Sequence, residues 1–197
     1  MNKHEILDRL LEENHGYLLT SQAVEKGVSG TVLSQYVKEN GLERAARGIY
    51  MADDVWPDEL FILQARSKKI IFCGETALFL HGLIDREPSE IWIAVPGGFN
   101  VSHIKHKKLR VKYPPEEIHS LGVCTTASAG GNPVRVYDKE RCICDLIRDR
   151  SNTEVQNFQT AIKEYMSEKN KNLTRLIRYA QILGIRDEVM KYVEVLV

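Results

Sequence analysis

The sequence predicts an α+β protein, in which a small and mostly helical N-terminal domain precedes a larger domain of mixed strands and helices. Three observations lead to this prediction. Residues 1–41 contain three segments with the apolar spacing of amphipathic helices, each followed by a glycine. Short runs typical of strands begin only after residue 41. Residues 139–197 return to helical spacing, so the C-terminal part is expected to be helical.

The three N-terminal segments have recognisable start and stop signals. The helices are expected at residues 3–13, 19–27 and 28–41. Thr20 or Ser21 can cap the second helix and Ser29 the third, because short polar side chains accept hydrogen bonds from the first free amides of a helix. Gly27 ends the second helix just before the third begins. Two short helices joined in this way form a helix-turn-helix pattern.

The third segment has two distinct faces when its residues are placed about 100° apart. One face is apolar and contains Val32, Leu33, Tyr36 and Val37. The opposite face is polar, has no carboxylate at its centre and leaves Glu39 at its margin; its members are Thr31, Ser34, Gln35 and Lys38. These side-chain types, with Ser29 at the helix start, contact phosphates and base edges in the major groove of DNA. We therefore expect this helix to bind DNA.

The stretch "LERAARGIY", residues 42–50, predicts a β-hairpin directly after the third helix. Two short strand-like runs flank Arg47 and Gly48, and glycine adopts the positive φ of a tight turn without penalty. A hairpin in this position is the wing of a winged helix-turn-helix. Arg44 and Arg47 are then expected to contact the sugar-phosphate backbone rather than the bases.

The charge of this first domain leaves an alternative open. Residues 1–55, which we assign to the winged helix-turn-helix, contain six Lys and Arg against nine Asp and Glu, a net charge of −3. The whole chain is neutral, so residues 56–197 carry +3. A small acidic helical domain with a hairpin can equally be a protein-interaction module that does not bind DNA.

Residues 56–197 are expected to form a mixed α/β domain with a helical C-terminal part. Strands are expected at residues 70–72, 90–95, 109–113, 122–127 and 134–137, with a hairpin turn at residues 130–133. Helices are expected at residues 59–69, 74–83, 139–150 and 154–166, followed by two more helices separated by Gly184.

A basic run at residues 102–112 has two interpretations. It contains two histidines, no acid and five cations, which are Lys105, Lys107, Lys108, Arg110 and Lys112. It can be an edge strand whose lysines deter aggregation. It can also be a second nucleic-acid contact, which Arg175 and Arg178 would extend. The absence of acids favours the second interpretation.

The sequence contains no pattern that requires catalysis or a cofactor. No phosphate-binding GxxxxGK[ST] loop or GxGxxG motif is present. His81 lies in an apolar setting that is typical of a structural histidine. The acids Asp138, Glu140 and Asp145 surround a helix start, where acidic side chains interact favourably with the helix dipole. This explanation is favoured over a metal-dependent nuclease site. We therefore expect a protein that is not an enzyme and needs no cofactor.

Cysteine usage and hydropathy give an expected location. The chain has no signal-peptide core at its N-terminus and no apolar run long enough to span a membrane. A cytoplasmic protein with reduced cysteines is expected. The spacing of Cys142 and Cys144 is not that of paired zinc ligands, so buried free thiols are favoured over a metal site.

Three blocks of sequence, taken in order, resemble the AbiEi family of bacterial antitoxins. They are "ARGIY" at residues 46–50, "GETALFLHGL" at residues 74–83 and "VRVYDKERCICDLIRDR" at residues 134–150. The resemblance extends over nearly the whole chain. Members belong to type IV toxin–antitoxin systems that act in abortive infection and phage defence.

The resemblance implies functions that spacing alone does not indicate. It implies a winged helix-turn-helix that represses its own operon by binding inverted repeats in the promoter. It also implies a C-terminal domain that counters a nucleotidyltransferase-like toxin without a stable complex. The DNA-reading candidates carried over by position are Thr31, Ser34, Gln35 and Lys38, with Arg44 and Arg47 on the wing. No dimerising coiled coil is visible, so we expect a monomer that pairs on DNA.

Overall fold

The computed structural model describes residues 2–102, 104 and 108–196, which divide by their contacts into two compact units. The first unit is Met1–Lys68 with Ala127–Val134, and the second is Lys69–Thr126 with Arg135–Val197. The predicted α+β class is confirmed. The sequence predicts that the first domain ends at residue 55, whereas the first unit continues to Lys68. Units defined by contacts need not coincide with domains, and the predicted domain limits stay a prediction.

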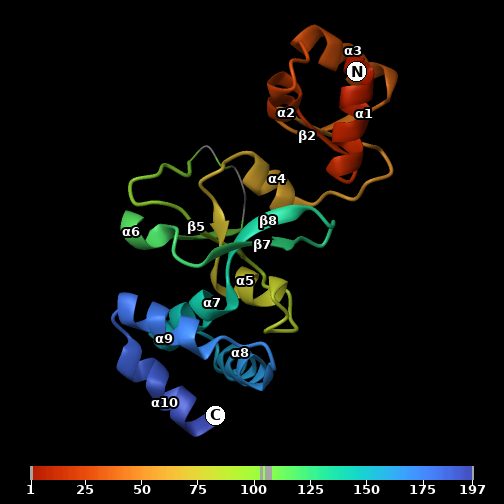
Figure 1. Ribbon diagram of the computed structural model, residues 1–197. Helices are drawn as coiled ribbons and strands as arrows, with labels where there is room; N and C mark the ends of the chain where they lie inside the picture. Colours follow the sequence, from red (N-terminus) through yellow and green to blue (C-terminus); the bar gives the residue numbers. More distant parts are fainter. Residues whose placement is uncertain (1, 103, 105–107, 197) are drawn as a thin grey trace. The chain divides into compact units, whose positions relative to one another are not determined.

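The first unit combines helices with a small antiparallel sheet, coloured red to orange in Figure 1. Its elements are α1 (Lys3–Glu13), β1 (Tyr17–Leu19), α2 (Thr20–Glu25), α3 (Gly30–Glu39), β2 (Glu43–Ala46), β3 (Ile49–Met51) and α4 (Glu59–Ala65). The strand order is β1-β3-β2, with both pairs antiparallel. The predicted helices and hairpin are therefore confirmed.

Two details at the start of α2 differ from the prediction. Residues 17–19 form strand β1 beside β3, and a run of three residues carries too little periodicity to be recognised as a strand. The N-cap position of α2 belongs to Leu19, with no side-chain cap hydrogen bond, so the predicted capping by Thr20 or Ser21 is wrong. Thr20 is instead the first helical residue, and its amide donates to the Gly48 carbonyl at 2.9 Å.

An apolar core joins α1, α2 and α3. Its buried members are Leu7, Leu10, Leu18, Ala23, Val28, Leu33 and Tyr36. Burying one aliphatic side chain of this size contributes about 1.5–3 kcal/mol, so this cluster supplies the main stabilisation of the three helices. Their polar faces are thereby directed away from the core.

The hairpin tip at residues 127–134 completes the first unit around a buried carboxylate. Asp58 is the N-cap of α4, and its Oδ1 accepts a hydrogen bond from the Phe61 amide at 3.1 Å. Its Oδ2 accepts hydrogen bonds from Ser128 Oγ at 2.5 Å and from Asn132 Nδ2 at 3.0 Å. Tyr17 Oη accepts from the Asp58 amide at 2.6 Å. Asp58 therefore joins a helix start, β1 and the hairpin tip.

The second unit is built on a five-stranded sheet with the order β6-β5-β4-β8-β7. The strands are β4 (Ile71–Phe72), β5 (Ile91–Ala94), β6 (Leu109–Lys112), β7 (Val123–Ala127) and β8 (Pro133–Tyr137). β4 pairs antiparallel with β5 and parallel with β8, while β5 pairs parallel with β6. All five predicted strands and the turn at residues 130–133 are confirmed, and β6 is an edge strand.

Helices of the second unit gather around α7. They are α5 (Gly74–Leu80), α6 (Glu116–His119), α7 (Lys139–Arg148), α8 (Val155–Ser167), α9 (Leu173–Ile182) and α10 (Arg186–Leu196), with a short 3₁₀ turn η1 (Arg150–Asn152). Helix α7 contacts α5, α8, α9 and α10, and the group from α7 to α10 is coloured teal to blue in Figure 1. The sequence does not predict α6, because four residues are too few to establish a helical period.

Among the helices described here, none combines the length and apolar character that crossing a membrane requires.

Replacing Asp58 by alanine is expected to lower the free energy of unfolding by about 2–3 kcal/mol, because three donors lose a buried acceptor and α4 loses its cap. Equilibrium urea unfolding of the full chain, followed by circular dichroism, measures this change. The matched control is Asp53→Ala, an exposed acid in the same segment, with an expected change within about 0.5 kcal/mol. Equal stability of the two variants would contradict the anchoring role of Asp58.

Candidate nucleic-acid interface

Helix α3 directs its predicted contact residues to solvent. Ser29 is the N-cap residue, and its Oγ accepts a hydrogen bond from the Val32 amide at 3.4 Å, as expected. Leu33 and Tyr36 are buried on the opposite side. The exposed residues are Ser29, Thr31, Ser34, Gln35 and Lys38. The amphipathic division of the helix is therefore confirmed, while the contact of these five residues with DNA stays a prediction.

Tyr36 fixes the rotation of α3 about its axis. Its hydroxyl donates to Asp8 Oδ1 on α1 at 2.5 Å, and its ring meets His4 edge-on with centroids 5.5 Å apart. Burial, followed by the hydrogen bond to Asp8, raises the pKa of Tyr36. The phenol therefore stays protonated and continues to donate at neutral pH. Because Gln35 precedes Tyr36, this contact also fixes the direction in which Gln35 points.

The exposed face of α3 includes a carboxylate. Gln35 Nε2 donates to Glu39 Oε1 at 2.8 Å, and both side chains are exposed. The angular count leaves Glu39 at the margin of this face, but positions i and i+4 are neighbours on a helix surface. The i, i+4 spacing of Gln35 and Glu39 therefore indicates this pair, which the angular count does not predict.

The β2–β3 hairpin carries the two predicted arginines next to α2. Arg44 lies opposite Tyr50 in the hairpin, and Arg47 precedes the turn glycine. Gly48 has a φ of +75°, which glycine adopts readily. Both arginines are exposed. The hydrogen bond from Thr20 to Gly48 holds this turn at the start of α2, so the hairpin is attached to the helix pair.

The basic run of the second unit is only partly described. Lys105 and Lys107 lie outside the described residues, and Lys108 is exposed just before β6. Arg110 Nε lies 3.5 Å from Glu90 Oε2, and its guanidinium lies 4.8 Å from the Trp92 ring centroid. The side chain of Arg110 is therefore engaged with partners in its own unit.

Lys112 is also engaged inside the second unit. Its Nζ is ion-paired with Asp149 and lies 5.1 Å from the Trp92 ring centroid. Arg175 in turn lies 3.4 Å from Glu140 Oε2. These cations already have acidic partners, so a nucleic acid would compete with them. The structure thus agrees with the edge-strand interpretation, and the second nucleic-acid contact stays a prediction.

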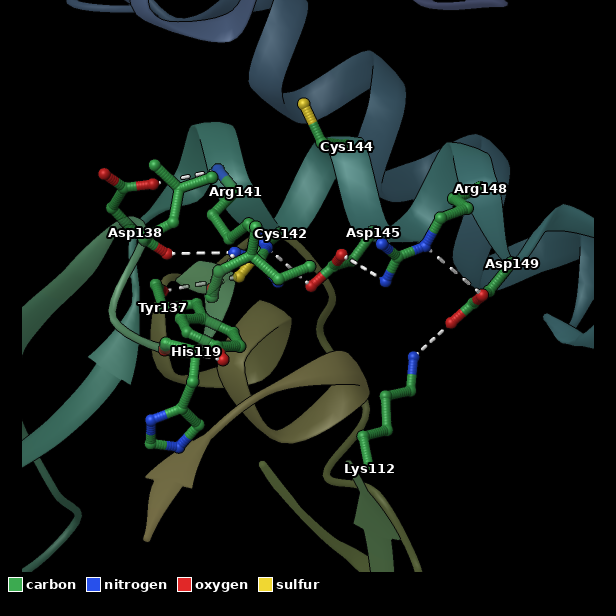
Figure 2. Close-up of polar contacts among 12 residues, drawn as sticks. Lys112, His119, Tyr137, Asp138, Arg141, Cys142, Cys144, Asp145, Arg148 and Asp149 are labelled. Atoms are coloured by element: carbon green, nitrogen blue, oxygen red, sulfur yellow. Dashed lines mark hydrogen bonds and ion pairs between the residues drawn. The ribbon is translucent and has the colours of Figure 1, made fainter. Parts of the chain in front are cut away.

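Helix α7 carries a chain of charges in alternating order, which Figure 2 shows. Arg141 Nε donates to Asp145 Oδ2 at 3.0 Å, and Arg148 Nη2 donates to Asp145 Oδ1 at 2.7 Å. Arg148 Nε lies 3.9 Å from Asp149 Oδ1, and Asp149 completes the chain with Lys112. Arg141 is 1% exposed, so Asp145 balances a charge that is removed from solvent.

The remaining donors of Arg141 hold the segment around α6. Its Nη1 donates to the carbonyl oxygens of Ile118 at 2.8 Å and Leu121 at 3.1 Å. Its guanidinium also lies 4.5 Å from the Tyr137 ring centroid. The charge chain therefore connects α6, α7 and the edge strand β6, and these contacts stabilise the second unit.

The acids near the start of α7 have different roles from one another. Asp138 is the N-cap, and its Oδ1 accepts from the Arg141 amide at 2.8 Å, as a helix-start acid should. Glu140 lies in the first turn and also accepts from Tyr165 Oη at 3.2 Å. For Asp145 the predicted dipole explanation is wrong, because this residue lies in the second half of the helix and pairs with two arginines.

Two cavities of about 390 and 360 Å³ border the charge chain and share Lys112, Asp145 and Asp149. Trp92 lines the larger cavity and packs so closely on Gly74 that a Cβ there would lie 2.5 Å from Trp92 Cε3. The arginines, lysines and aspartates in the cavity walls are held by the ion pairs and hydrogen bonds described above. Glu75, which also lines the larger cavity, accepts a hydrogen bond from Asn157 Nδ2 at 3.1 Å. A ligand would have to displace existing partners.

The described thiols are poorly suited to nucleophilic chemistry. Burial raises the pKa of Cys73 and of Cys144 to about 12, and that of Cys142 well above its ordinary value. These groups are protonated at neutral pH. His81 Nε2 lies 2.8 Å from the Tyr137 carbonyl, and burial lowers its pKa. Within the described residues, no group of three or more His, Cys, Asp and Glu is placed to hold a metal ion.

Asp145→Ala is expected to lower the free energy of unfolding by about 3–5 kcal/mol, because it leaves the buried Arg141 guanidinium without a counter-charge. Urea unfolding of the full chain tests this. Asp187→Ala, on an exposed helical position, is the control and is expected to change little. Asp145→Asn, which keeps the side-chain volume but removes the charge, is expected to lose most of the same free energy. An Asn variant as stable as wild type would assign the loss in Asp145→Ala to packing rather than to charge.

Comparison with known proteins finds a family model that matches the N-terminal part of the chain. Residues 3–86 match the family model described as a transcriptional regulator, the AbiEi antitoxin N-terminal domain. No curated protein matches the sequence. The crystal structure of the RV2827C protein from Mycobacterium tuberculosis is similar, with a TM-score of 0.55 and 12% sequence identity over 89% of this chain and 70% of that chain. At this identity the likeness shows the fold alone. Residues 3–86 are therefore similar to the N-terminal domain of AbiEi antitoxins, which is described as a transcriptional regulator.

Proposed function

We propose that this protein is an antitoxin and transcriptional repressor that binds its own promoter through a winged helix-turn-helix. One observation carries the proposal. The exposed polar face of α3 and the exposed arginines of the β2–β3 hairpin belong to one unit, in which Thr20 and Gly48 join helix and hairpin. The family match over residues 3–86 supports the regulatory role.

In the proposed mechanism, α3 enters the major groove and the hairpin lies against the neighbouring backbone. Thr31, Ser34, Gln35 and Lys38 then face base edges and nearby phosphates. Arg44 and Arg47 neutralise phosphates beside the groove, which adds affinity that depends on salt and not on sequence. Because residues 1–55 carry a net charge of −3, this affinity has to come from cations gathered on one surface.

The finer parts of the function follow from the family and belong to the same proposal. Two copies, monomeric in solution, occupy inverted repeats in the promoter of a type IV toxin–antitoxin operon that acts in phage defence. The protein counters a nucleotidyltransferase-like toxin in the cytoplasm, without catalysis and without a stable complex. The similarity of the chain to a transcriptional regulator domain of AbiEi antitoxins supports this assignment.

A second candidate function is direct binding of a protein partner, and one observation favours it. Trp56 is 91% exposed and follows the exposed acids Asp53 and Asp54. An aromatic side chain within an acidic segment suits a basic protein surface better than a phosphate backbone. This interaction module would bind its toxin tightly and would show little salt-dependent affinity for DNA.

Arg47→Ala is expected to weaken binding to every duplex and to reduce the slope of log affinity against log salt by about one unit. Gel shifts of the full chain on its own upstream DNA and on a scrambled duplex, at two salt concentrations, measure both effects. Arg186→Ala, an exposed arginine on α10, is the control and should change neither.

Gln35→Ala is expected to act differently in the same assay. It should cost about 1–3 kcal/mol on the upstream DNA and little on the scrambled duplex, because it removes a base contact and no charge. If wild-type protein does not distinguish the two duplexes, the interaction module becomes the better assignment. A search for a complex with the product of the neighbouring gene would then follow.

A further inference from the structure

We propose that Glu39 positions the Gln35 amide to recognise adenine, so that each operator half-site has an A·T pair opposite Gln35. The inference rests on the proposed function and adds a base preference and a positioning residue to it. Its starting point is the hydrogen bond of 2.8 Å from Gln35 Nε2 to Glu39 Oε1, on the exposed face of α3.

A count of donors and acceptors gives the preferred base. A glutamine amide has two N–H donors and one carbonyl acceptor. One N–H of Gln35 is taken by Glu39, so one N–H and the carbonyl oxygen remain for a ligand. In the major groove adenine presents the N7 acceptor and the N6 amino donor side by side. The free groups of Gln35 complement this pair.

The same count disfavours guanine at this position. Guanine presents two acceptors in the major groove, N7 and O6, and a bidentate contact with it needs two donors. Gln35 held by Glu39 has only one donor left. Without Glu39 the amide could turn and donate with both hydrogens, so the carboxylate converts a permissive side chain into a selective one.

The setting of the pair makes this geometry persist. Tyr36, held by Asp8, fixes the rotation of α3. Asn40 Nδ2 donates to the Tyr36 carbonyl at 3.0 Å at the end of the helix, which orders the turn that carries Glu39. A carboxylate in the last turn opposes the helix dipole. The hydrogen bond from Gln35 gives the Glu39 carboxylate a favourable contact that offsets this.

The test is selection of duplexes from a randomised double-stranded DNA library by the full chain. Wild-type protein is compared with Gln35→Ala, Glu39→Ala and Glu39→Gln, and with Gln181→Ala, an exposed glutamine on α9, as the control. Circular dichroism checks that each variant is folded. The position read by Gln35 is the one at which Gln35→Ala shows no base preference.

We expect adenine at that position for wild type and for the Gln181→Ala control. Glu39→Ala should retain the rest of the motif but reduce the preference for adenine over guanine there by about tenfold. Binding of the selected duplex and of its adenine-to-guanine variant quantifies the change. Glu39→Gln should lose part of the preference, because a neutral amide oxygen accepts the Gln35 hydrogen more weakly.

Three outcomes would overturn the inference. A selected motif with guanine at the Gln35 position contradicts the donor count. An unchanged adenine preference in Glu39→Ala removes the positioning role. A cytosine preference lost in Glu39→Ala alone would mean that Glu39 reads a base itself. In each case the protein still selects a motif and the repressor proposal survives, whereas no enrichment by wild type would overturn both.

Discussion

The candidate interface depends on how Tyr36 is held between α1 and α3. Its ring lies in the N-terminal core and its hydroxyl donates to Asp8, so hydrophobic burial and a directional hydrogen bond act on one side chain. Burial alone would hold α3 in contact with α1 but would permit small rotations, because dispersion contacts have little directionality. The hydrogen bond removes that freedom, and the direction of every exposed α3 side chain follows from it.

Cations have contrasting surroundings in the two units. In the second unit Lys112 and Arg148 pair with acids, and the buried Arg141 fills its bonds with Asp145 and two carbonyl groups. These charges hold the edge strand and α6 to α7. In the first unit Arg44 and Arg47 stand exposed on a hairpin. Net charge conceals this difference, because affinity for a polyanion depends on where unneutralised cations gather.

Local signals allowed much of this fold to be predicted from the sequence. The Ser29 cap, the amphipathic α3 and the turn at Gly48 each depend on residues within one helical turn or one hairpin. The predictions failed where an element was very short or where a partner was distant. Strand β1 exists because residues 17–19 pair with β3. Lys112 meets Asp149, a residue 37 positions away, and no pattern local to the basic run indicates that partner.

The Gln35–Glu39 pair is neither a feature that the sequence predicts nor one that depends on a distant partner. Its spacing is local and was available from the sequence, yet an angular count assigns each residue to a face singly and ignores bonds between neighbours. A recognition helix reads bases with the donors and acceptors that remain after its own hydrogen bonds are made. Glu39 takes one donor from Gln35. The base preference of α3 is therefore a property of the pair, and a list of exposed polar residues is insufficient to specify it.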